Sequence, residues 1–146
     1  MLVTVVLVAA LVLFRGLGLL GVEAVASWRG AAAWALAAMF AFTASAHFTG
    51  RRHDLARMVP RALPHPAFLV RLTGVLEVLG AIGLLVPATR GLAGLGLVAL
   101  VAAMFPANAN AAARGVTLRG RPPTPLWLRA PMQLLFVGLT WWASQG

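Results

Sequence analysis

The chain of 146 residues is 61% hydrophobic and only 10% charged, and its mean hydropathy is +0.90. Soluble domains carry about 25% charged residues, so this composition excludes an ordinary soluble domain. The net charge of +9 comes from arginine alone, because the sequence has no lysine. The arginines lie between apolar runs, which favours contact with lipid headgroups over nucleic-acid binding. We therefore predict one membrane domain over residues 1–146, with the lipid bilayer as its partner and no nucleic acid.

Five apolar runs predict an all-α fold, a polytopic transmembrane helical bundle. The expected spans cover residues of about 2–26, 30–48, 67–86, 91–113 and 126–143. A helix needs about 20 apolar residues to cross a hydrocarbon core of about 30 Å, and each run is close to that length. The first run is interpreted as a span and not as a signal peptide, because no charged segment precedes it.

Arginine is distributed unevenly over the predicted loops. Only Arg29 and Arg90 follow the first and third spans. The loops after the second and fourth spans hold seven arginines, namely Arg51, Arg52, Arg57, Arg61, Arg114, Arg119 and Arg121. Cytoplasmic loops carry the excess of positive charge, so the basic loops and the N-terminus are predicted to be cytoplasmic and the C-terminus outside. The expected location is a bacterial-type inner membrane, crossed several times.

The third span contains Glu77 near its middle, one of only three acids in the chain. A charged side chain at that depth costs roughly 2.5 kcal/mol or more, so Glu77 should face protein or trapped water. Small residues lie three and four positions away on its helix face, among them Thr73, Gly74, Gly80 and Ala81. Small residues let another helix approach closely, whereas the opposite face is large and apolar. The Glu77 face is therefore predicted to point into the bundle.

Further polar residues are predicted to meet Glu77 in one pocket in the cytoplasmic half of the bundle. They are His47, Asn108, Asn110, Arg129 and Gln133. Pro106 cannot donate to the carbonyl four residues earlier, so the fourth span should loosen there. Asn108 and Asn110 then either satisfy the loosened backbone or line the pocket, and the sequence leaves both interpretations open.

Arg15 in the first span also has two interpretations. It shares a helix face with Glu23, eight residues on, if the helix runs to residue 26, and it then reaches the outer headgroups. Alternatively it neutralises a buried acid such as Glu77, because charges inside a membrane usually find partners. No metal site is expected, since the chain has no cysteine and His53 and His65 have no metal-ligand spacing.

Several motifs taken together resemble the DoxX-like family of small membrane proteins. In order, they read MFAFTASAHF, MVPRALPHP, TGVLEVLGAIGLLVPATR, FPANANAA and LWLRAPMQ, over residues of about 36–142. The resemblance implies a four-helix core formed by spans two to five, with the first span as an addition. The positions that match the family's motif are His47, Pro64, Gly74, Glu77, Pro87, Pro106, Asn108 and Gln133.

Family members have been linked to quinone or thiosulfate oxidation, to oxidative-stress complexes and to receptor assembly. The resemblance thus implies an accessory subunit of a quinone-linked redox system, with a quinone-like lipid as ligand and a redox enzyme as partner. A buried acid, a histidine and amide donors suit the carbonyls and protons of a quinone. Two other functions stay open: a non-catalytic assembly or chaperone protein, and a carrier of a small lipophilic molecule. No residue is assigned a catalytic role, and the oligomeric state is left open.

Overall fold

The computed structural model describes residues 1–146 and contains six α-helices. These are α1 (Leu2–Leu19), α2 (Trp28–Phe48), α3 (Arg52–Met58), α4 (Pro66–Leu85), α5 (Arg90–Arg114) and α6 (Leu126–Ser144), with a short 3₁₀ turn η1 (Glu23–Val25) between α1 and α2. The predicted all-α class is confirmed. Four helices, α1, α2, α4 and α5, are long and apolar enough to cross a membrane. Helix α6 has 19 residues but is less apolar and is not among these four.

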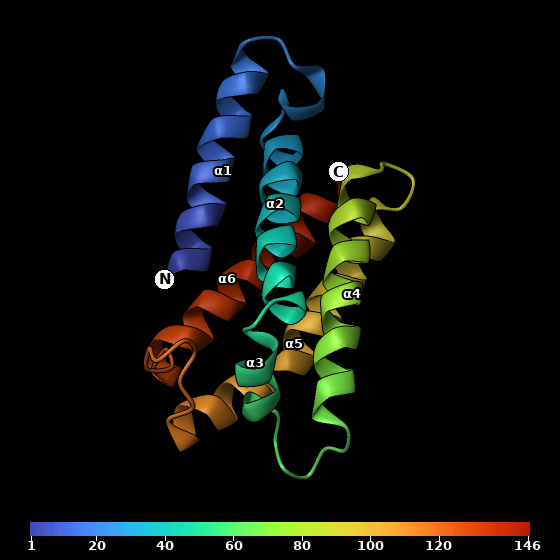
Figure 1. Cartoon of the computed structure of the whole chain (residues 1–146). Coiled ribbons are helices and arrows are strands. Elements are labelled where there is room, and N and C mark those ends of the chain that lie inside the picture. Colours follow the sequence, from blue (N-terminus) through green and yellow to red (C-terminus); the bar gives the residue numbers. More distant parts are fainter.

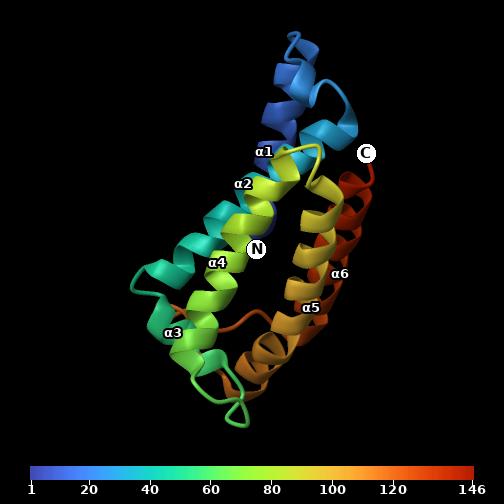
Figure 2. The same ribbon diagram turned by 90° about the vertical axis from the view of Figure 1, so that its right-hand side faces the viewer.

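Helix α2 lies at the centre of the bundle and packs against α1, α4 and α6 (Figure 1). The view in Figure 2 shows two helix pairs, α2 with α4 and α5 with α6, which lie apart at mid-height. The pairs are joined at one end by the turn between α4 and α5. At the other end, the short helix α3 packs against both α4 and α5. This arrangement leaves the space between the pairs for the site.

The first half of α2 is rich in alanine, and its alanines are almost fully buried. Ala31, Ala33 and Ala35 have no exposed surface, and Leu36 beside them is also fully buried. Such small side chains let neighbouring helices approach closely, which is how helices associate where lipid removes the hydrophobic driving force. The hydroxyl of Ser27 accepts a hydrogen bond of 2.9 Å from the Gly30 amide and so caps the start of α2.

The glycine face of α4 packs against its neighbours, as predicted for the Glu77 face. A Cβ atom added to Gly74 would lie 2.5 Å from the Cβ atom of His47 on α2. A Cβ atom added to Gly80 would lie 2.5 Å from the side chain of Leu97 on α5. Leu79, on the opposite face, is 59% exposed. The rotation of α4 therefore turns Glu77 inwards and its large apolar residues outwards.

The first span is shorter than predicted, and this corrects the expected range of 2–26. Helix α1 ends at Leu19, and Gly21 adopts a φ of +100°, which only glycine accepts without strain. The chain then turns back, and Gly18 lies directly against the backbone of Val25, with no room for a side chain. Glu23 therefore lies beyond the helix and does not share a face with Arg15. Helix α1 packs chiefly on α2.

Different segments of the chain meet at the two ends of the bundle. At one end, Met58 of α3 packs with Ala111 and Val116, beside Leu118 of the second basic loop. At the other end, the guanidinium of Arg90 donates a hydrogen bond of 3.5 Å to the carbonyl of Gly146. The basic loops after α2 and α5 thus share one end, and the α4–α5 turn shares the other end with the C-terminus.

Candidate functional site

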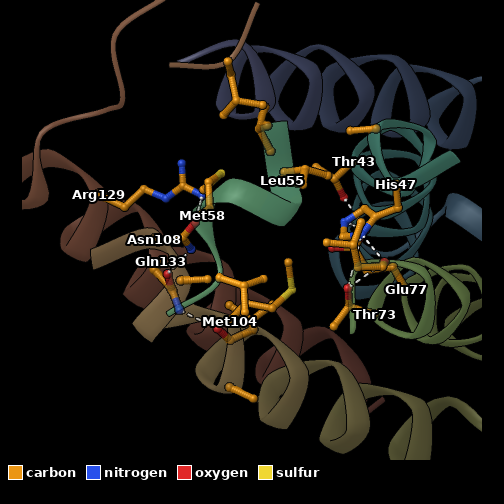
Figure 3. A pocket seen from close by; sticks show the side chains of 18 of the residues that line it. Thr43, His47, Leu55, Met58, Thr73, Glu77, Met104, Asn108, Arg129 and Gln133 are labelled. Carbon is orange, nitrogen blue, oxygen red and sulfur yellow. Dashed lines mark hydrogen bonds and ion pairs between the residues drawn. The ribbon is translucent and has the colours of Figure 1, made fainter. Parts of the chain in front are cut away.

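A cavity of about 530 Å³ lies between the two helix pairs. Of its 29 lining residues, 19 are hydrophobic. Apart from Arg51, its polar residues form two groups, which Figure 3 shows on opposite sides with Leu55, Met58 and Met104 between them. We call them the Glu77 wall (Thr43, His47, Thr73 and Glu77, from α2 and α4) and the Arg129 wall (Asn108, Arg129 and Gln133, from α5 and α6).

On the Glu77 wall, Glu77 is only 4% exposed. The hydroxyl of Thr43 donates a hydrogen bond of 3.2 Å to its Oε2 atom. The Nε2 atom of His47 lies 3.7 Å from the same oxygen, too far for a direct hydrogen bond. The Glu77 carboxylate therefore accepts one direct hydrogen bond from a side chain. A small shift of the His47 ring would bring its Nε2 atom within hydrogen-bonding distance of the carboxylate.

The other nitrogen of His47 fixes the orientation of the ring. Its Nδ1 atom lies 2.6 Å from the carbonyl oxygen of Val70 and 3.2 Å from the hydroxyl of Thr73. A carbonyl can only accept, so the hydrogen sits on Nδ1, and Nε2 is the atom directed at Glu77. Gly74 allows this approach because it has no side chain in the way of the His47 ring. Helices α2 and α4 thus hold the His47–Glu77 pair in one geometry.

The Arg129 wall is a chain of hydrogen bonds that begins at the backbone of α5. The amide of Gln133 donates to the carbonyl of Val101. The amide of Asn108 donates to Oε1 of Gln133 at 3.4 Å, and Nη2 of Arg129 donates to Oδ1 of Asn108 at 2.6 Å. Pro106 loosens the backbone one turn after Val101, although α5 stays helical through it. The carbonyl that Pro106 leaves without a helical donor is that of Ala102, four residues earlier, whereas Gln133 binds the neighbouring carbonyl of Val101, and Asn108 lines the cavity.

Two residues predicted for the pocket lie elsewhere. The amide of Asn110 donates a hydrogen bond of 2.7 Å to the carbonyl of Met58, so it joins α5 to α3 and is not near Glu77. The guanidinium of Arg15 donates to the carbonyl of Ala26 at 3.0 Å and lies 5.0 Å from the ring centre of Trp28. Arg15 therefore does not neutralise Glu77. Of the two interpretations left open for Arg15, the pairing with Glu77 is wrong, because its contacts place Arg15 beside the turn between α1 and α2.

The cavity also contains residues that were not predicted as part of the site. Thr43 lies one helical turn before His47, and this spacing could have placed it on the same face. Arg51 and all five methionines of the chain also line the cavity, and these methionines are Met1, Met39, Met58, Met104 and Met132. Methionine is flexible and adapts to irregular space, but no sequence pattern marks these positions. No three acidic, histidine or cysteine side chains lie close enough together to hold a metal ion.

Four helices are long and apolar enough to cross a membrane, and the cavity in the bundle is lined by both apolar and polar residues. These features define the class of multi-pass helical membrane proteins. Within that class, residues 36–144 match the family described as Domain of unknown function (DUF8561), so the chain belongs to this family. The match runs from the middle of α2 to the end of α6 and leaves α1 outside it. No curated protein and no solved structure matches the chain. The comparisons do not identify the chain as a DoxX-like protein.

Proposed function

We propose that this protein binds a small lipophilic molecule with oxygen-bearing polar groups in the cavity between its helix pairs. The observation that carries the proposal is the cavity itself. Its volume of about 530 Å³ falls within the range of about 300–1,000 Å³ that is usual for ligand sites. A mostly apolar lining with a few converging polar groups is also typical of such sites.

A purely structural role for the polar residues accounts less well for this cavity. Protein interiors are closely packed, and an unfilled space deprives its lining of dispersion contacts. Side chains whose only role was to lock the bundle would fill the space between the helix pairs. Here the two polar walls lie on opposite sides with apolar side chains between them. This favours ligand binding over the alternative of a non-catalytic assembly protein.

A quinone-like lipid is one ligand with suitable chemistry, because it presents two carbonyl oxygens on an apolar body. One oxygen would lie near Thr43 and His47, and the other near Arg129 and Asn108. The DoxX-like resemblance supports the finer proposal that the protein is an accessory subunit of a quinone-linked or oxidative-stress redox system. The chain has no cysteine, so a redox partner enzyme would supply or accept the electrons.

We further propose that all five long helices cross the membrane, including α6. Helix α6 packs along α5 and also touches α2. Its polar residues Arg129 and Gln133 line the cavity and do not face lipid. The excess of arginine in the loops after α2 and α5 supports a cytoplasmic N-terminus, an outer C-terminus and an inner-membrane location.

A pair of variants on α5 tests ligand binding. Ala102 and Ala103 are both exposed, but only Ala103 lines the cavity. Ala103→Phe should fill part of the cavity, and Ala102→Phe should add the same side chain on the lipid side. The protein is extracted in its native lipids, and its bound small molecules are identified by native mass spectrometry. Uptake of a short-chain ubiquinone analogue is measured in parallel.

We expect the wild-type protein and Ala102→Phe to carry or take up a small lipophilic molecule, and Ala103→Phe to lose it. Wild-type protein that carries nothing and takes up no analogue contradicts ligand binding. In that case, co-purification of a stable protein partner would favour the assembly role.

A further inference from the structure

The geometry of the Arg129 wall points to a narrower ligand class: we infer that the cavity binds a lipophilic acid, whose ionised oxygen group pairs with Arg129. This inference rests on the proposed function and specifies its ligand. It follows from the charge balance of the chain, from the orientation of the guanidinium and from its surroundings.

Arg129 has no acidic partner within the protein. The chain has only three acids. Asp54 pairs with Arg57 at 3.2 Å, and Glu23 lies in the exposed turn between α1 and α2. Glu77 lies on the opposite wall of the cavity, where Thr43 donates to it and His47 lies 3.7 Å away. The positive charge of Arg129 is therefore uncompensated, although charges inside membrane proteins are usually paired.

The hydrogen-bond chain holds the guanidinium in a fixed position. Each amide in this chain is oriented by the next, from Val101 through Gln133 to Asn108. The only hydrogen bond that Arg129 makes to another residue's side chain or backbone through its guanidinium is the one to Asn108. An arginine carries several N–H donors in a planar fork that matches the two oxygens of a carboxylate or phosphate. The remaining donors are thus available to a bound molecule.

The surroundings of Arg129 strengthen its attraction for an anion. The guanidinium is partly buried and lines a cavity in which 19 of 29 residues are hydrophobic. Fewer water molecules and a lower dielectric constant make each charge interaction stronger than in bulk water. A second arginine, Arg51 at the start of α3, lines the same cavity. A neutral ligand would leave both positive charges without a partner, whereas an acid would compensate one of them.

The body of the ligand is expected to be apolar. Met58 and Met104 lie between the two walls, and Phe40 and Phe136 also line the cavity. The acid group could be a carboxylate or a phosphate ester, because both match the fork of Arg129. An alkyl chain or flat ring system would then extend from the Arg129 wall towards the Glu77 wall.

The test compares matched ligands on wild-type protein in nanodiscs of phosphatidylcholine, which carries no net charge. Retention is measured for labelled hexadecanoate, its uncharged methyl ester and hexadecyl phosphate, at a pH at which the acids are ionised. We expect at least one of the two acids to be retained about tenfold better than the ester, as a charge-assisted hydrogen bond in a low-dielectric site would give. The preferred acid identifies the headgroup as a carboxylate or a phosphate.

Two variants then assign the preference to Arg129. Arg129→Gln keeps a donor for Asn108 but removes the charge, so it should bind the acid and the ester equally. Arg71→Gln removes an exposed arginine of α4 that does not line the cavity, and it should keep the wild-type preference. If Arg129→Gln does not fold, Arg129→Lys replaces it and should keep the preference for the acid, because it keeps the charge.

Each result decides between the two proposals. Equal retention of the acids and the ester by wild-type protein overturns the inference but leaves the proposed lipophilic binding standing. Retention of none of the three, with no native small molecule and no quinone uptake, overturns the proposed function itself. An acid preference that persists in Arg129→Gln shows that another cation is responsible and also overturns the inference.

Discussion

The Nε2 atom of His47 on α2 lies 3.7 Å from the Oε2 atom of Glu77 on α4, and both side chains are 5% exposed. Two features hold the His47 ring in this position. The Val70 carbonyl holds the opposite side of the imidazole, and Gly74 leaves room for the ring. The pair therefore forms a rigid wall of the cavity, with a gap that one small shift or one bound group would close.

Glu77→Gln should strengthen retention of a lipophilic acid by up to about tenfold while the protein still folds. Glutamine keeps an acceptor for Thr43 but removes a negative charge from the same low-dielectric cavity, so an anion bound at Arg129 loses an unfavourable charge interaction. Retention of the bound molecule is measured in nanodiscs, with Glu23→Gln as the control because Glu23 is exposed and outside the cavity. Unchanged binding in Glu77→Gln would assign Glu77 a purely structural role.

Gly80→Leu should destabilise the bundle more than Leu79→Ala. Gly80 lies against the side chain of Leu97, so a larger side chain would separate α4 from α5 at a cost of about 1–3 kcal/mol or more. Leu79 is 59% exposed on the lipid side, where lipid tails replace its contacts. Thermal melting in detergent compares the two variants, and equal melting temperatures would mean that α4 is rotated differently.

Arg15→Gln should lower stability by about 1–2 kcal/mol and leave ligand binding unchanged. The substitution removes the hydrogen bond to the Ala26 carbonyl and the contact with the ring of Trp28. Both contacts join the end of α1 to the start of α2, away from the cavity. Melting and ligand retention are measured on the same preparation. A loss of ligand binding without a loss of stability would show that Arg15 takes part in ligand binding and would contradict this prediction.

Reporter fusions at residues 58, 90, 118 and 146 should report inside, outside, inside and outside. Met58 and Leu118 lie together at one end of the bundle, and Arg90 contacts Gly146 at the other. The arginine-rich end should face the cytoplasm. Opposite locations for residues 90 and 146 would show that α6 does not cross. A complete inversion of the pattern would contradict the assignment from loop charge.

Much of the fold could be predicted because the relevant signals are local. Long apolar runs predict helices of membrane length, and the small residues around Glu77 predict which face of α4 packs. The end of α1 was missed because the apolar run continues past Leu19. Only the close contact of Gly18 with Val25 requires the chain to reverse there.

The sequence by itself determined which polar residues lie within the helices and that Glu77 faces the protein. The tertiary structure decided which of them meet. Asn108 and Asn110 are two residues apart on one helix and so point to nearly opposite sides of it. Packing against α6 and α3 directs Asn108 to Arg129 and Asn110 to Met58. The register between helices is set by the fit of side chains from distant segments, so the pairing of Arg129 with Asn108 emerges only when α5 and α6 are packed together.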